Sequence, residues 1–225
     1  MSRQVSYNLI DLSMPIISLN TPVFPGYPEP LKAVYTTVRD NGFFSNIWIL
    51  VEHTATHVDS PAHFIEDGNT IDKIPVERFI AKGIVLDFSN VNAGYEINSR
   101  DLYNKIKELN MDSEVGDGWI ILFYTGYTEK AGTAKWMEHP VLREDACDAI
   151  INMGVNAIGI DAPSPDKEPF AAHKKLLSSG ILIYENLNNL GLLLSKRFTF
   201  LGIPLYLSGA SASPVRAVAV LEKEF

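Results

Sequence analysis

The sequence predicts a single mixed α/β domain over residues 1–225, with a mixed or barrel-like β-sheet flanked by a few helices. Short apolar runs bounded by turn residues, at 84–88 and 119–124, are typical of buried strands. Amphipathic stretches at 98–109 and 143–153 indicate helices between such strands. No repeat, low-complexity segment or linker divides the 225 residues, of which 46% are hydrophobic and 20% charged.

The N-terminal part of the chain is expected to form strands and a rigid loop. A short strand is expected at 7–13, and the proline-rich segment 21–30 that follows either walls a pocket or connects elements on the surface. Ala33–Val38 and Phe43–Glu52 are rich in β-branched and aromatic residues, and Asp40-Asn41-Gly42 separates them. This pattern predicts a β-hairpin.

Helices and strands are expected to alternate in the rest of the chain. Asn98 is a suitable N-cap for the first helix, and Gly154 should end the second. Further strands are expected at 155–161, 181–184, 200–207 and 215–221, with a short helix at 171–177.

Composition excludes several classes of partner. The net charge of −8 and the lack of a Lys/Arg run argue against nucleic acid. Cys147 is the single cysteine, which excludes an internal disulfide and a CxxC motif and agrees with a reducing compartment. The polar first residues do not resemble a secretory signal, and no apolar run approaches the ~20 residues of a membrane span. We therefore expect a cytoplasmic protein.

Three of the five histidines fall within residues 53–63, together with Asp59. Imidazole and carboxylate suit Zn²⁺ or Mn²⁺, so His53, His57, Asp59 and His63 indicate half of a metal site. On a fully extended strand, His53 and His57 would lie ~13 Å apart at ~3.3 Å per residue, too far to share an ion. The chain is therefore expected to bend between them.

The rest of the site is expected from distant parts of the chain. His173 lies near the short helix, and Glu185 directly follows an apolar run. Strand ends commonly carry chemistry in α/β proteins, which also makes Asp161 a weaker candidate. His139 is interpreted as a loop residue and Cys147 as part of the core.

These residues match a known signature. The segment His53-Thr-Ala-Thr-His-Val-Asp-Ser-Pro-Ala-His63 resembles the HxGTHxDxPxH motif of the cyclase family of metal-dependent hydrolases, which includes bacterial kynurenine formamidase and isatin hydrolase. Other segments, two before this motif and four after it, match further landmarks of the family in the right order. They are Asp11-Leu-Ser, Thr21-Pro-Val-Phe-Pro-Gly, Gly159-Ile-Asp-Ala-Pro-Ser, His173, Tyr184-Glu-Asn-Leu and Pro214-Val-Arg-Ala.

The resemblance implies a swivelling β/β/α fold with a barrel-like sheet and a homodimer or higher oligomer. It also implies a centre of one or two divalent ions, zinc first and manganese as the alternative. The implied ligands are His53, His57, Asp59, His173 and Glu185, with Asp59 able to bridge, and His63 would transfer protons. Two positions depart from the family pattern. Ala55 replaces a glycine, and Tyr27-Pro stands where kynurenine formamidases tend to carry an acidic residue.

The expected reaction is hydrolysis of an amide by metal-activated water, with a small molecule as substrate. The first hypothesis is an N-formyl aryl amide such as N-formylkynurenine, on which Phe24, Tyr27 and Phe64 would stack. The second is ring opening of a cyclic amide, as in isatin hydrolase, or another cyclase-type reaction. A hypothesis of another class is a metal-binding protein without turnover, which the presence of His63 beyond a sufficient ligand set disfavours.

Overall fold

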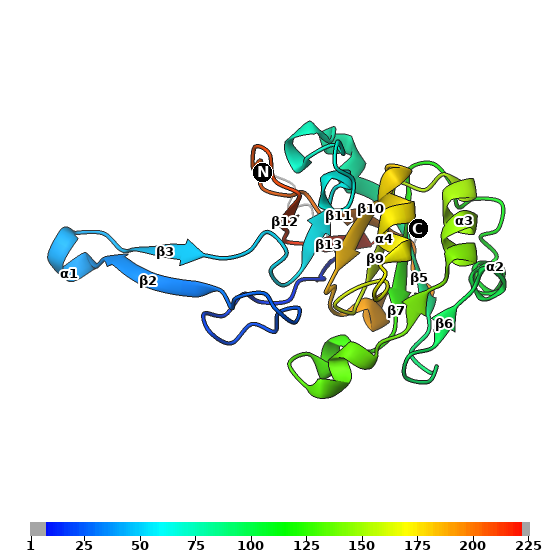
Figure 1. Ribbon diagram of the computed structural model, residues 1–225, viewed down its shortest axis with the longest axis horizontal. Coiled ribbons are helices and arrows are strands. Elements are labelled where there is room, and N and C mark those ends of the chain that lie inside the picture. The colour runs from blue at the N-terminus through cyan, green and yellow to red at the C-terminus, as the bar shows by residue number, and fades with distance from the viewer. Residues whose placement is uncertain (1–7, 222–225) are drawn as a thin grey trace, which may run out of the picture.

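A mixed nine-stranded sheet runs through the molecule in the computed structural model, which describes residues 8–221 (Figure 1). Its spatial order is β1-β13-β11-β5-β7-β9-β10-β4-β12. The bounds are Leu9–Asp11 for β1, His57–Asp59 for β4, Ile80–Asp87 for β5, Trp119–Tyr124 for β7, Ala157–Ile160 for β9, Leu182–Glu185 for β10, Phe198–Leu201 for β11, Ala212–Pro214 for β12 and Val218–Leu221 for β13. The sheet is strongly curled, so the prediction of a mixed, barrel-like sheet is confirmed.

Four parallel strands, β5, β7, β9 and β10, form the middle of this sheet, and antiparallel strands extend it on both sides. The helices α2 (Ser99–Glu108), α3 (Glu144–Met153) and α4 (Ala171–Ser178) lie on one side of these strands (Figure 1). Short 3-10 turns lie at Pro61–His63, Ile71–Lys73, Val76–Phe79, Thr128–Lys130, Ala134–Glu138 and Leu190–Leu193, and a small two-stranded sheet pairs β6 (Glu96–Ile97) with β8 (Val141–Leu142). Within residues 8–221, no helix is long and apolar enough to cross a membrane.

The predicted ends of the helices are confirmed. The Asn98 side chain accepts hydrogen bonds from the first turn of α2, and the Asp101 carboxylate accepts one from the Asn98 backbone in return. Gly154 ends α3 with a φ of 71°, the left-handed conformation that glycine adopts without strain. The buried residues of α3 are Ala146, Cys147, Ala149 and Ile150, which places Cys147 in the core as expected.

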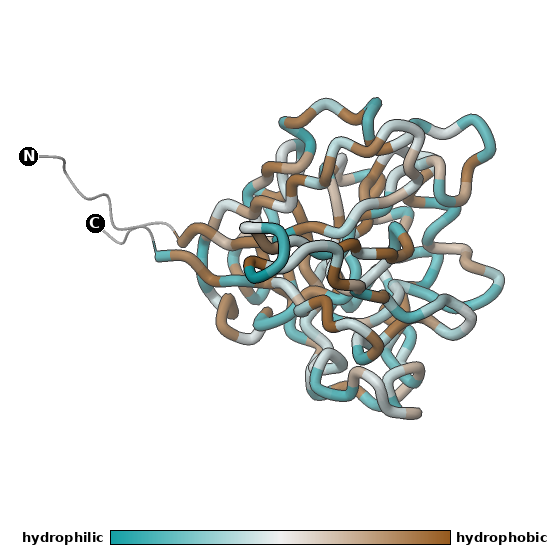
Figure 2. Tube along the Cα trace, turned by 90° about the vertical axis from the view of Figure 1, so that its left-hand side faces the viewer, coloured by the Kyte–Doolittle hydropathy of each residue, from teal (hydrophilic) through white to brown (hydrophobic). Residues whose placement is uncertain are grey.

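Both faces of the central strands are buried. Along β7, Ile121 and Phe123 pack towards the helices, whereas Ile120 and Leu122 pack towards the inside of the curled sheet. This alternation follows from the two-residue period of a strand. It explains why the sequence of β7 is a continuous apolar run, as parallel strands covered on both faces require. Figure 2 shows hydrophobic residues in brown recurring along the trace of the body.

Gly159 allows close packing between β9 and its neighbours. A Cβ at this position would lie 2.6 Å from both Leu122 Cδ2 and Leu187 Cδ1. Real Cβ atoms do not approach other carbons so closely, so any side chain between Ile158 and Ile160 would force the two buried leucine side chains to move.

The predicted hairpin projects from the body as an arm, defined as residues 31–49 (Figure 1). It consists of β2 (Leu31–Thr36), the short helix α1 (Val38–Asn41) and β3 (Ser45–Ile49). Gly42 ends α1 with a φ of 79° and turns the chain back, so the predicted turn residues do make the turn. β3 stops before Glu52, and residues 50–56 lead irregularly into the body.

The strand predictions near the C-terminus need correction: the strand predicted at 215–221 begins only at Val218, the one at 200–207 is too long, and one strand was missed. The strand predicted at 200–207 is wrong beyond Leu201, because the chain leaves the sheet at Gly202 and Pro204, which has no N–H for a ladder, forms only an isolated bridge. The strand β12 was missed because its sequence, Ala-Ser-Pro, has low strand propensity. It adds to β4 and completes the sheet edge beside the histidine-rich segment. The start of the strand predicted at 7–13 lies partly outside the described residues.

Candidate metal centre

Two antiparallel strands bring the first residues of the cluster together. β4 carries His57 and Asp59, and in its pairing with β10 His57 lies opposite Glu185. Because side chains of one strand alternate between faces, His57 and Asp59 share a face with Glu185. The bend expected after His53 is present, since Ala55 has a φ of 55° and β4 begins only at His57.

The imidazole of His57 is oriented by a backbone carbonyl. Its Nδ1 donates to the carbonyl of Ala55 at 2.8 Å, and the amide nitrogen of Asn186 donates to the same carbonyl at 3.1 Å. This tautomer leaves a lone pair on Nε2, which lies 3.3 Å from Glu185 Oε2 and 3.4 Å from Asp59 Oδ1. An imidazole that donates from one nitrogen and points the other at carboxylates is arranged as a metal ligand.

His173 in α4 has the same arrangement. Its Nδ1 donates to Asp166 Oδ1 at 2.7 Å, and its backbone N–H donates to Asp166 Oδ2 at 2.9 Å. Its Nε2 then lies 3.2 Å from Glu185 Oε1 and 3.7 Å from Asp59 Oδ2. The helix therefore brings a second imidazole to the same two carboxylates.

The donor atoms that meet here lack partners of their own. His57 Nε2, both carboxylate oxygens of Asp59 and Glu185 Oε1 are buried without a hydrogen bond. Buried carboxylates are costly unless a cation compensates them, and nitrogen and carboxylate oxygen are donors for Zn²⁺ and Mn²⁺. The residues present therefore fit a divalent cation.

The electrostatics of the cluster agree with this fit. Without a cation, burial lowers the pKa of His57, but the carboxylates of Asp59 and Glu185 outweigh burial and raise that pKa to about 10, so Nε2 holds a proton where a bound cation would use its lone pair. Burial likewise raises the pKa of Asp59, but the neighbouring histidines reverse this and hold it well below its usual range. The carboxylate pair thus attracts positive charge to the point where the ring nitrogens meet.

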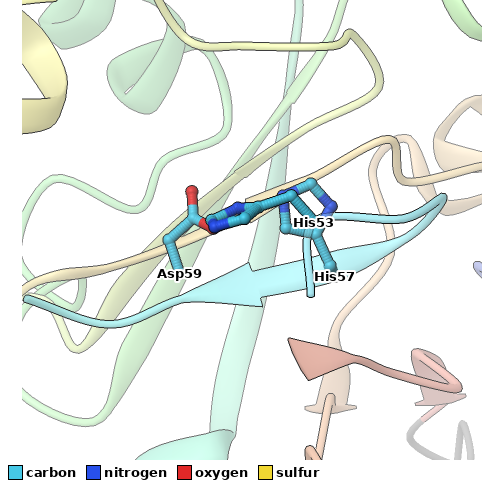
Figure 3. A group of neighbouring side chains, drawn as sticks. All are labelled: His53, His57 and Asp59. Atoms are coloured by element: carbon cyan, nitrogen blue, oxygen red, sulfur yellow. The ribbon is translucent and has the colours of Figure 1, made fainter. Parts of the chain in front are cut away.

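His53 and His63 complete the cluster on the open side. Figure 3 shows His53, from the segment before β4, with its ring near the ring of His57 and the carboxylate of Asp59, which the strand carries. His53 Nδ1 lies 2.8 Å from Asp59 Oδ1, and ligand atoms of His53, His57 and Asp59 all lie within 4.8 Å of one another. Asp59, His63 and His173 form a second group of the same kind, so His63 is within reach of a second ion. Burial lowers the pKa of His63 to about 4, which keeps its ring neutral.

A cavity of about 190 Å³ opens onto the cluster. Its polar floor includes His53, His57, His63, His173 and Glu185, and its walls are aromatic. The three aromatic residues expected from sequence all line it, namely Phe24, Tyr27 and Phe64, and Phe170 joins them. Phe64 packs against Phe170 at 5.5 Å between ring centroids. The structure therefore brings together the five proposed ligands, His63 and the three aromatic residues, and leaves out only the weaker candidate Asp161.

Comparison with known proteins identifies the family of this chain. Residues 10–167 match the family model described as "Putative cyclase". The chain belongs to the cyclase family. Two relatives of this cyclase cover most of both sequences. The uncharacterized protein MJ0783 of Methanocaldococcus jannaschii is 34% identical over 95% of this chain and 99% of its own length. A kynurenine formamidase of Bacillus mycoides is 29% identical over 93% and 95%.

Solved structures share the fold of this cyclase. An isatin hydrolase bound to the product analogue thioisatinate superposes with a TM-score of 0.88, at 23% identity, over 96% of this chain and 93% of that one. A predicted metal-dependent hydrolase from Bacillus stearothermophilus superposes with a TM-score of 0.77, at 25% identity, over 95% and 98%. The fold of the chain is thus that of metal-dependent hydrolases.

Three residues considered from sequence lie apart from the cluster. Both oxygens of Asp161 accept hydrogen bonds from Thr125 and Gly126, at 2.6–2.8 Å, so this weaker ligand candidate anchors the loop after β7 instead. His139 is fully buried and donates from Nδ1 to the Pro140 carbonyl. Cys147 is buried in α3.

Sequence reasoning did not single out Phe170, Asn186 or Asp166. Phe170 reaches the cavity because its backbone is left-handed, with a φ of 59°, at the start of α4. Asn186 follows Glu185 within the segment Tyr184-Glu-Asn-Leu, which by itself indicates no role for the asparagine. Asp166 is seven residues from His173, and only the turn between β9 and α4 brings the two side chains together. The one signal in the sequence for Asp166 is its position, as a carboxylate a few residues before His173, the candidate ligand on the short helix.

Proposed function

We propose that this cyclase-family chain is a metal-dependent amidohydrolase that cleaves an N-formyl aryl amide, such as N-formylkynurenine. The proposal assigns His53, His57, Asp59, His173 and Glu185 to one or two divalent cations, with zinc first and manganese as the alternative. Relatives named kynurenine formamidase, at about 30% identity over most of the chain, support the substrate class.

One observation carries the proposal. The unpaired donor atoms of His57, Asp59 and Glu185 meet at the floor of a cavity whose walls are aromatic. A cation at that floor would activate a water molecule and polarise the carbonyl of a substrate. The aromatic walls would hold a flat ring above it. A purely structural metal site would not need this open, walled approach.

The cavity volume limits the substrate. At about 190 Å³ it is smaller than the ~300–1,000 Å³ typical of sites for drug-sized ligands. This size suits the aryl ring with its formamide group, and the amino-acid side chain of N-formylkynurenine would extend towards the mouth of the cavity. Phe24 and Tyr27 come from the proline-rich loop, Phe64 follows the turn Pro61–His63, and Phe170 precedes α4. Within this proposal, the four rings surround the aryl group.

His63 is assigned the proton transfers. Its ring centroid lies 4.0 Å from that of His53 and 5.8 Å from that of His173, at the edge of the cluster. Because burial keeps the imidazole neutral, it can accept a proton from the attacking water. The same proton then passes to the nitrogen of the breaking C–N bond, which yields formate and the aryl amine.

The proposal is tested by metal analysis and a substrate panel. The purified protein is expected to contain zinc or manganese and to hydrolyse N-formylkynurenine or formanilide. Isatin serves as the contrasting cyclic amide. Turnover of isatin alone would move the assignment to ring opening, and bound metal without turnover of any of the three would refute hydrolysis of this substrate class.

The role of His63 has its own test. His63→Ala is expected to lower kcat by 10²–10⁴-fold, the usual contribution of a proton-transfer group, while metal content stays unchanged. Loss of one metal equivalent in this variant would instead identify His63 as a ligand, as its distance to Asp59 and His173 allows. Full turnover with normal metal content would contradict both roles.

A further inference from the structure

Asn186 carries a polar atom that no contact within the described residues explains. The residue is 5% exposed and lines the cavity, and its Oδ1 has no hydrogen-bond partner. An unpaired amide oxygen at such a buried place costs free energy in the free protein. This cost indicates that the amide oxygen of Asn186 has a partner in the functional complex.

The orientation of this amide is fixed. Its Nδ2 donates to the carbonyl of Ala55, and because a carbonyl only accepts, the NH₂ group must face it and Oδ1 must face away. The backbone of Asn186 is also held, since its N–H donates to Ala162 O and its carbonyl accepts from Thr56 Oγ1. Asn186 therefore presents an acceptor in a preset direction.

The other polar groups of the cavity already have tasks. The carboxylate of Glu185 and the ring nitrogens of His57 and His173 face the cation position. The hydroxyl of Ser164 donates to Asp166 Oδ1 and accepts from the Asp166 N–H. Two neutral oxygens of the cavity lining remain for a substrate, the phenol oxygen of Tyr27 and the amide oxygen of Asn186, and the Asn186 oxygen is the one buried without a hydrogen-bond partner.

We propose that Asn186 Oδ1 accepts a hydrogen bond from the N–H of the scissile amide and thereby selects secondary amides over esters. This inference rests on the proposed function. A buried N–H needs an acceptor, and an ester of the same shape would leave Oδ1 unpaired. Asn186 would thus orient the bond to be broken over the cation site and separate amide from ester substrates.

The test compares formanilide with phenyl formate, which has an ester oxygen in place of the N–H. The ratio of their kcat/KM values cancels any loss of metal or of general activity. Asn186→Ala is expected to lower this ratio about tenfold, as the loss of one buried hydrogen bond does. Asn186→Asp keeps an acceptor oxygen but loses the NH₂ group that donates to the Ala55 carbonyl, so it is expected to retain more of the wild-type ratio than Asn186→Ala while total activity falls.

Thr56→Val is the matched control. It removes a hydrogen bond to the Asn186 backbone without removing the Oδ1 acceptor, so it is expected to change both substrates equally. An unchanged ratio in Asn186→Ala would overturn the inference while leaving amide hydrolysis intact. If the metal-loaded wild-type protein hydrolyses neither compound or N-formylkynurenine, the proposed function itself fails and the inference falls with it.

Discussion

Replacing Asp166 by asparagine should weaken the metal centre without touching a ligand. The carboxylate of Asp166 accepts from both His173 Nδ1 and the His173 backbone N–H. An asparagine has only one oxygen, so it can serve one of these donors while its NH₂ faces the other. If the NH₂ faces the ring, the imidazole must move its proton to Nε2, the atom that lies 3.2 Å from Glu185 Oε1. The lone pair for the cation is then lost.

The magnitude follows from the contacts removed. Partners that orient a ligating histidine typically contribute 10–100-fold to metal affinity, or about 1.4–2.7 kcal/mol. If the NH₂ faces the backbone instead, the loss is one hydrogen bond of α4, about 1 kcal/mol of folding stability, and the metal affinity falls less. The two outcomes are separated by measuring both quantities.

The assay is a competition titration with a chelator of known affinity, together with urea unfolding of the metal-free protein. Asp145→Asn is the matched control. The Asp145 carboxylate, in the first turn of α3, also accepts two hydrogen bonds, from the N–H and the hydroxyl of Ser99 at the start of α2, but Asp145 contacts no proposed metal ligand. The control should lose stability and keep its metal affinity. Wild-type metal affinity and wild-type stability in Asp166→Asn would together refute this reasoning.

Three further predictions concern single positions. Ala55→Gly should raise the free energy of unfolding in urea by up to about 1 kcal/mol. The left-handed conformation of alanine costs ~1–2 kcal/mol, and the greater backbone entropy of unfolded glycine offsets ~0.5–1 kcal/mol of the gain. A decrease of more than about 1 kcal/mol would show that Ala55 is not strained. Burial raises the pKa of Cys147 to about 12, so its thiol keeps its proton between about pH 7 and pH 9. Ellman's reagent should therefore label Cys147 only after the protein unfolds. Rapid labelling of the folded protein would show that the thiol is not buried in the core. Asn98→Ala removes the cap of α2 and should cost about 1 kcal/mol with unchanged metal content; a fall in metal content would show that α2 is coupled to the site.

Local patterns in the sequence were sufficient for much of the fold. The cap at Asn98, the glycine after α3 and the apolar run of β7 act over a few residues, so their signals lie within those residues. The prediction at 200–207 failed because Leu205 and Tyr206 have strand-like character but lie exposed in a loop. Strand propensity reflects how well side chains pack on a half-buried sheet, and the sequence alone does not show which apolar segments find a place in the sheet.

The sequence predicted the metal-binding residues of the site better than the residues that orient them. Histidines and carboxylates are rare enough in such a cluster to indicate a metal, and the structure does bring His173 and Glu185 to Asp59. The groups that orient these ligands are common residue types, and only the fold gives them their role. The sequence does not distinguish Asn186 from the other asparagines of the chain, and only the structure shows that its amide donates to the Ala55 carbonyl.

The most direct test of the account is to remove and restore the metal while following hydrolysis of N-formylkynurenine. The protein as purified is expected to hold one or two equivalents of zinc or manganese per chain. Chelation should abolish turnover, and the same metal should restore it in proportion to the equivalents bound, whereas Glu185→Gln should bind less metal and recover little activity. Full activity in protein shown to be metal-free would contradict the central claim that His57, Asp59 and Glu185 converge to hold a catalytic cation.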